Sequence, residues 1–225
     1  MGVGDAWFLA AGAWWPTLAG HLIHAGRFGD TAGEQERWGF GLIGGTTGVA
    51  LSTVWLSLGG MSEGGAFIAH SGGGVGLMLG GLTELFARGD IETTPLAGMG
   101  YGAGLGWLAA SAFARKIHVA PTRVLALDIG AVLGGLGGAA LASPLIFDSP
   151  SAGAQRAWVG IAAGSAVVGT GIAWYATRQR EGEASSAPSR RTASVGLPTV
   201  GVLGESRAGE RRAPVWGMSW QGAIP

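Results

Sequence analysis

The sequence predicts an all-α fold: a polytopic membrane bundle of six transmembrane helices, built as three repeated hairpins with glycine-zipper packing. Charged residues form only 12% of the 225-residue chain and glycine supplies 45 positions, which leaves few charged side chains for a surface exposed to water. Six apolar segments are long enough to cross a bilayer, which takes about 20 residues. Within them, glycines recur at every fourth position in two patterns that alternate along the chain.

The first hairpin is predicted at residues 6–58. Its crossing segments are 6–26 and 38–58. Trp7 and Trp38 begin the two segments and Trp55 lies near the end of the second, where an indole ring favours the headgroup level of a bilayer. Pro16 lies inside the first segment, so we expect a bend there.

The second hairpin is predicted at residues 64–114. Its crossing segments are 64–86 and 94–114. Asp90 and Glu92 lie in the connection between them, and charged residues there indicate a turn outside the hydrocarbon. Glu84 and Arg88 are four residues apart at the end of the first segment, which predicts an ion pair on one helix face.

The third hairpin is predicted at residues 122–177, followed by a tail. Its crossing segments are 122–146 and 154–177. Trp158 and Trp174 lie near the two ends of the second segment, as expected of interfacial tryptophans. These three hairpins form one domain over residues 1–180. Residues 181–225 are polar and charged at first, which predicts a flexible C-terminal tail.

Glycine spacing predicts how these helices pack. One pattern occupies the first helix of each hairpin and the other pattern occupies the second, and both return at intervals of about sixty residues. Fifteen of the eighteen positions are glycine: Gly12, Gly20, Gly44, Gly48, Gly72, Gly76, Gly80, Gly98, Gly102, Gly106, Gly130, Gly134, Gly138, Gly160 and Gly164. Small residues at this spacing let helix axes approach closely in lipid.

Two other fold classes fit less well. A soluble helical domain needs a polar face, which the six segments almost lack, and each glycine would cost a water-exposed helix about 1 kcal/mol. A transmembrane β-barrel needs strands of about 10 residues with one apolar and one polar face. Here both faces stay apolar along whole segments.

Basic residues predict the orientation. If the N-terminus is cytoplasmic, ten of the fourteen basic residues lie on the cytoplasmic side, and four lie outside: Arg27, Arg37, Arg88 and Arg156. Basic residues concentrate on the cytoplasmic side of membrane proteins. We therefore predict a multi-pass protein of the bacterial cytoplasmic membrane with both termini in the cytoplasm.

His70 and Asp128 are the candidate functional residues. Each lies two positions before the first patterned glycine of its hairpin, so the two occupy matching depths. Two residues correspond to a helical rotation of about 200°, which turns both side chains away from the glycine seam. An ionisable residue within a membrane indicates either a proton or cation path or a structural pair with a neighbouring helix, and we favour the structural pair.

Other chemistries have little support. With no cysteine there is no disulfide or thiolate site, and no Cys, Asp or Glu accompanies His21 and His24 within their segment, so we predict no metal and no cofactor. The glycine runs lack the GK[ST] ending of a phosphate loop. Acidic and basic residues balance at fourteen each, which argues against nucleic acid. The expected partner is the lipid bilayer, while a protein partner for the tail and a homo-oligomer stay open.

The GxxxG series, with breaks such as ALASPLIF at residues 140–147, resembles uncharacterised glycine-rich multi-helix membrane proteins of bacteria. The resemblance covers residues 6–178 and implies a membrane-embedded helical fold without implying an activity. We predict a non-enzymatic structural, assembly or anchoring module of the bacterial envelope. The alternative is a small transporter or channel that passes protons or cations by way of His70 and Asp128.

Overall fold

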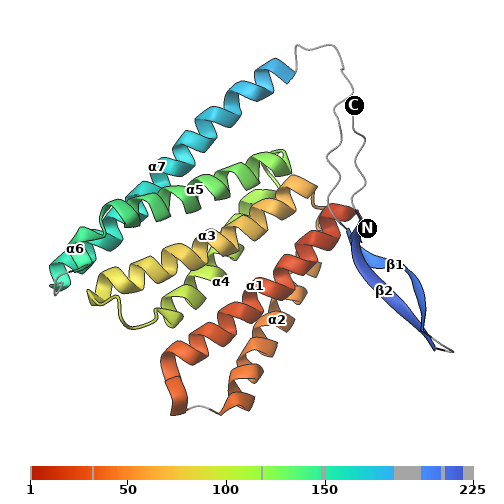
Figure 1. Ribbon diagram of the computed structural model, residues 1–225, viewed down its shortest axis with the longest axis horizontal. Coiled ribbons are helices and arrows are strands. Elements are labelled where there is room, and N and C mark those ends of the chain that lie inside the picture. The colour runs from red at the N-terminus through yellow and green to blue at the C-terminus, as the bar shows by residue number, and fades with distance from the viewer. Residues whose placement is uncertain are drawn as a thin grey trace. The chain divides into compact units, whose positions relative to one another are not determined.

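The computed structural model describes residues 2–31, 33–117, 119–147, 151–184, 199–208 and 211–219. The chain divides into two compact units, Met1–Arg180 and Glu181–Pro225. The described residues of the first unit are mainly helical (Figure 1).

Each predicted crossing segment is helical over most of its length. The helices are α1 (Val3–Phe28), η1 (Gly29–Thr31), α2 (Glu34–Ser57), α3 (Glu63–Arg88), α4 (Leu96–Ala114), α5 (Pro121–Leu141), α6 (Pro144–Phe147) and α7 (Ala152–Ala184). The fifth predicted segment, 122–146, is divided into α5 and α6. Pro144 lacks an N–H group and disfavours helical backbone at Ser143, so α5 ends before this pair.

Neighbouring helices in the sequence form hairpins. α1 lies against α2, α3 lies against α4, and glycines of α5 face α7 (Figure 1). α1 also packs on α3 and α4, and α3 packs on α5, so α1 and α3 are the central helices. The buried core between them combines small residues with a few rings, among them Phe8, Ala66, Ala69 and Trp107.

Four helices in the described part of the chain are long and apolar enough to cross a membrane. They are α2, α3, α5 and the part of α7 at Ala152–Arg178. α1 and α4 are outside this set. α1 contains three tryptophans, Pro16 and two histidines, and α4 contains five glycines in 19 residues, all residue types of low hydropathy. The prediction that six helices cross a membrane therefore stays a prediction.

Large apolar side chains lie on the outside of the helical unit. Leu42 is 68% exposed, Leu133 64% and Val167 68%, whereas Ala11, Ala66 and Ala103 are fully buried. In water the burial of large apolar groups stabilises a fold, so a soluble domain places such side chains inside. Here small residues fill the interior and large ones face outward, which is the arrangement expected in lipid.

Backbone meets backbone in the first two hairpins. A Cβ added at Gly76 or Gly102 would lie within 3.0 Å of the backbone of the facing helix, and the same holds for Gly72 and Gly80 against α4. In the first hairpin Gly12 faces Gly48, Gly44 faces Pro16, and Gly20 faces Phe40. A Cβ added at any of these glycines would clash with the facing backbone, so a larger side chain there would force the two helices apart.

The third hairpin uses a different register on its second helix. Gly130 faces Gly169, while Gly134 and Gly138 face Ser165, the residue after Gly164. The predicted packing residues Gly160 and Gly164 lie outside this contact. A Cβ at Gly160 would first meet the Phe86 ring at 3.8 Å, and one at Gly164 would meet nothing within 4 Å. One residue turns a helix by about 100°, which moves these two glycines off the contact face.

The second unit contains two strands that the sequence analysis did not predict. β1 (Thr199–Ala208) pairs antiparallel with β2 (Arg211–Ser219), with a register irregularity between Val202 and Gly204. The remainder of the predicted flexible tail, apart from the last turn of α7, lies outside the described residues.

Candidate functional site

A pocket of about 390 Å³ lies between α1, α3 and α5, and both candidate residues line it. Trp15 comes from α1, His70 and Ser71 come from α3, and Asp128 comes from α5. Most of the remaining wall is apolar, formed by Phe67, Val75, Met78, Leu125, Ala131 and Val132. The structure thus brings the two candidate residues to one pocket, while the prediction that they occupy matching depths in a membrane stays a prediction.

Asp128 is half-buried in this pocket and accepts a hydrogen bond from the Ser71 hydroxyl. Among the described residues no ion pair involves it. Arg123, five residues earlier on α5, places its guanidinium carbon 4.3 Å from the centre of the Trp174 ring. The Ser71 hydroxyl donates one hydrogen bond to the Asp128 carboxyl group but carries no charge that would balance a carboxylate.

His70 uses both ring nitrogens to hold α3 against α1. Trp15 Nε1 lies 3.3 Å from His70 Nδ1, and His70 Nε2 lies 3.2 Å from the Trp7 carbonyl oxygen. An indole N–H can only donate, so Nδ1 accepts and Nε2 carries the proton that it donates to the carbonyl. This is the neutral tautomer. The Trp7 ring also meets the imidazole edge-on, with centroids 5.8 Å apart.

The structure brings His70 and Asp128 to one pocket, but no hydrogen bond between them is present in the described residues. Their link is indirect, through Ser71, the neighbour of His70 on α3. Sequence reasoning missed Ser71, Trp15 and Gly73. A Cβ at Gly73 would collide with the Trp15 ring, so this glycine makes room for the indole beside His70. The run of three glycines after His70 and Ser71 is the signal that could have indicated a close approach at this point.

The other histidines of the first helix pack against rings. His24 is buried between Phe28 and Phe40, with ring centroids 4.9 Å and 4.5 Å away. The His21 ring lies 5.4 Å from Trp38. Within the described residues there is no group of three or more His, Cys, Asp or Glu side chains that could hold a metal ion.

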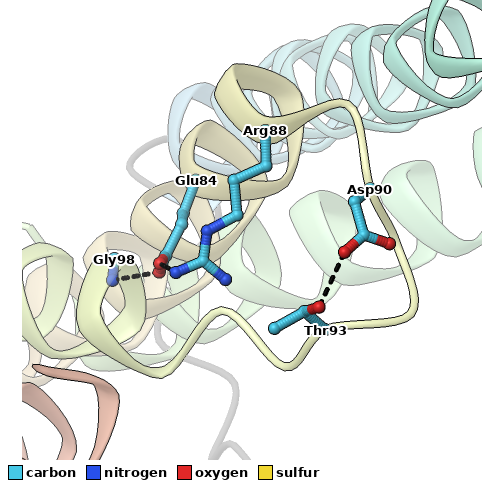
Figure 2. Close-up of polar contacts among 5 residues, drawn as sticks. All are labelled: Glu84, Arg88, Asp90, Thr93 and Gly98. Atoms are coloured by element: carbon cyan, nitrogen blue, oxygen red, sulfur yellow. Dashed lines mark hydrogen bonds and ion pairs between the residues drawn. The ribbon is translucent and has the colours of Figure 1, made fainter. Parts of the chain in front are cut away.

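A second polar cluster lies where α3 turns into α4 (Figure 2). Glu84 accepts a hydrogen bond from the Gly98 N–H and pairs with Arg88, which confirms the predicted ion pair. In the loop, Asp90 accepts from the Thr93 hydroxyl at 2.6 Å and from the Glu92 N–H at 2.8 Å. These two hydrogen bonds, the first above all, hold the pKa of Asp90 below its usual 3.8. The cluster caps a helix and shapes a turn, so we assign it a structural role.

Together, the helical unit and its pocket define a helical membrane protein, with four helices able to span a bilayer and a half-buried carboxyl group in an apolar pocket. The chain matches no protein-family model, no curated protein and no solved structure.

Proposed function

We propose that the chain is an integral protein of the bacterial cytoplasmic membrane in which all six long helices cross as three hairpins, with both termini in the cytoplasm. The pairing of the helices supports this arrangement. α4 lies along the candidate span α3 from Gly98 to Gly106, and α1 lies along the candidate span α2 from Gly12 to Gly20. We expect a helix that packs this closely along a membrane-spanning helix to span the bilayer as well.

Within that membrane the protein acts as a non-enzymatic structural module, which assembles or anchors a partner through its tail. One observation carries this proposal: the polar side chains that line the pocket are hydrogen-bonded to one another or to α1, and the helices of the first two hairpins meet backbone to backbone. Both nitrogens of His70 contact α1 groups, and Ser71 is bonded to Asp128. A polar path for ions needs groups that can exchange partners with the ion.

Flux measurements test the structural role. The purified full-length protein is reconstituted in liposomes, and proton and cation fluxes are measured beside protein-free vesicles and an Asp128→Asn variant. The structural role predicts tight vesicles in every case. Flux that the wild type carries and Asp128→Asn lacks would overturn it.

The second candidate is a small transporter or channel for protons or cations. The specific observation in its favour is the shared pocket, which places His70 and Asp128 on one surface between three helices. In this case protonation of Nδ1 would break the hydrogen bond from Trp15 and free α1 from α3 at that point. A His70→Ala variant that abolishes flux while the bundle stays folded would favour transport.

A further inference from the structure

We propose that the pocket between α1, α3 and α5 binds a lipophilic organic cation, a ligand that joins one permanent positive charge to an apolar body. This binding site goes beyond the assembly role proposed above.

Asp128 supplies the charge for recognition. Its carboxylate is half-buried, and its hydrogen bond comes from a neutral hydroxyl, that of Ser71. No ion pair in the described residues involves it. A carboxylate in an apolar site is stabilised when a cation joins it, because the attraction is stronger there than in water.

The shape of the pocket selects an organic cation over a bare metal ion. A volume of about 390 Å³ lies in the range of small-molecule sites. A metal such as Ca²⁺ takes six to eight oxygen ligands, whereas this pocket offers one carboxylate and one hydroxyl, and both nitrogens of His70 are engaged by α1.

The walls fit the rest of such a ligand. Trp15 and Phe67 contribute rings, and Met78 contributes a flexible thioether side chain. The face of an indole attracts cations, and an apolar wall favours the hydrocarbon part of the same ligand.

The pocket opens on the apolar outer surface. Leu125 and Val132 are 52% and 50% exposed, and they lie three residues before and four residues after Asp128. These spacings place all three side chains on one face of α5. A ligand that partitions into the bilayer therefore reaches the carboxylate sideways from the lipid, without passing through water inside the bundle.

Benzyltrimethylammonium is a suitable probe, because its charge is permanent and it cannot donate a hydrogen bond. Neopentylbenzene, which has carbon in place of nitrogen, is the matched neutral probe. Binding is measured by equilibrium dialysis with the full-length protein in phosphatidylcholine nanodiscs, with empty nanodiscs as background. We expect saturable binding of the cation, and we expect the neutral probe to bind wild type and Asp128→Asn alike.

Three variants identify the groups responsible. Asp128→Asn should lower the affinity for the cation at least about tenfold, since it removes the charge and keeps the shape. Asp90→Asn removes a carboxylate outside the pocket and should leave the affinity within about twofold. Gly74→Leu keeps Asp128 but fills the pocket: a Cβ at Gly74 meets the Trp15 ring at an ordinary 3.6 Å, and the longer side chain occupies the ligand volume.

Absence of saturable binding to the wild type would overturn the proposal, and so would equal affinity in Asp128→Asn. If Asp128→Asn does not yield a monodisperse protein, Gly74→Leu decides, and unchanged affinity in that variant overturns the site. The assembly role is tested separately by flux, so the two proposals fail independently.

Discussion

At Gly76 the backbones of α3 and α4 leave no room for a methyl group. A Cβ there would lie 2.9 Å from the Gly106 Cα and within 3.0 Å of the Gly102 carbonyl group, which belong to a helix main chain that cannot yield locally. Gly164 on α7 is also a helical glycine, but a Cβ there meets nothing within 4 Å. The two positions separate the packing role of glycine from its effect on helix propensity.

Alanine substitutions at these two positions should therefore have different effects on the free energy of unfolding. Gly76→Ala is expected to lower the free energy of unfolding by about 1–3 kcal/mol, the typical cost of overpacking a close contact. Gly164→Ala should leave it unchanged or raise it by up to about 1 kcal/mol, because alanine favours helix. Denaturant titration of the purified protein in detergent, followed by circular dichroism, measures both. Equal destabilisation by the two variants would contradict the assigned packing.

The Asp90 turn gives the protein a local response to acid. The folded pKa is depressed below 3.8, so the contribution of the Asp90 carboxylate is fully present above pH 3.8 and is lost as the pH falls through the lower folded value. We expect the amide resonance of Glu92 to titrate with a midpoint below 3.8 in NMR spectra. Thr93→Val removes the largest cause of the shift and should raise that midpoint. A midpoint that Thr93→Val leaves unchanged would show that the hydroxyl does not set the pKa.

At the scale of the helix, α4 depends on a neighbour for its first turn. Its N-cap residue, Pro95, provides no side-chain hydrogen bond, and Glu84 of α3 accepts from the Gly98 N–H instead (Figure 2). The carboxylate also lies at the positive end of the α4 dipole, which favours a negative charge. One side chain thus joins the end of α3 to the beginning of α4.

Removing this carboxylate should weaken the second hairpin. We expect Glu84→Ala to lower the free energy of unfolding by about 1–2 kcal/mol, because the Gly98 N–H loses its acceptor and α4 loses its cap. Arg88→Ala is the matched control. The Arg88 side chain is 39% exposed against 13% for Glu84, so water screens its pairing and the variant should cost less than about 1 kcal/mol. Amide exchange at Gly98 is the second readout, and it should accelerate only in Glu84→Ala.

Helix positions could be predicted from the sequence because apolar length and charged connections are local signals. Side-chain partners could not. The sequence predicts Gly160 and Gly164 as packing residues, whereas the α5 glycines face Ser165 and Gly169, since the register between two helices depends on which small residues fit across the contact. Trp15 and His70 are 55 residues apart, so their hydrogen bond depends on how α1 packs against α3. The strands β1 and β2 escaped notice because a charged, glycine-containing tail carries a weak strand pattern.

At the scale of the whole molecule, the helical unit has mostly small residues in its interior and large apolar residues on its surface. Fully buried alanines lie between helices whose outer faces carry exposed leucine, isoleucine and valine. In lipid, exposing apolar side chains costs no free energy, because the surrounding chains are apolar too. Close packing of small residues then supplies the contacts between helices. In water the same unit would expose large apolar side chains on all of its long helices.

The number of crossings sets which connections share a side of the membrane. If all six long helices cross, Glu92 between α3 and α4 lies on the side opposite to Lys116 between α4 and α5. If only the four candidate spans α2, α3, α5 and α7 cross, α4 stays on one side and the two residues lie together. The chain has no cysteine, so Glu92→Cys and Lys116→Cys each place a single thiol in an otherwise thiol-free protein.

A membrane-impermeant maleimide applied to intact bacterial cells should therefore label Glu92→Cys and leave Lys116→Cys unlabelled until the cells are opened. We expect this difference because α4 packs along α3 through their glycine contact. While Gly76 and Gly102 stay in contact, we expect the two helices to cross the membrane together. Glu36→Cys and Arg178→Cys form the second pair. If six helices cross, these two residues lie on opposite sides of the membrane, and if four helices cross, they lie on the same side. Labelling of both members of either pair in intact cells would contradict six crossings and would place α1 or α4 at the membrane surface.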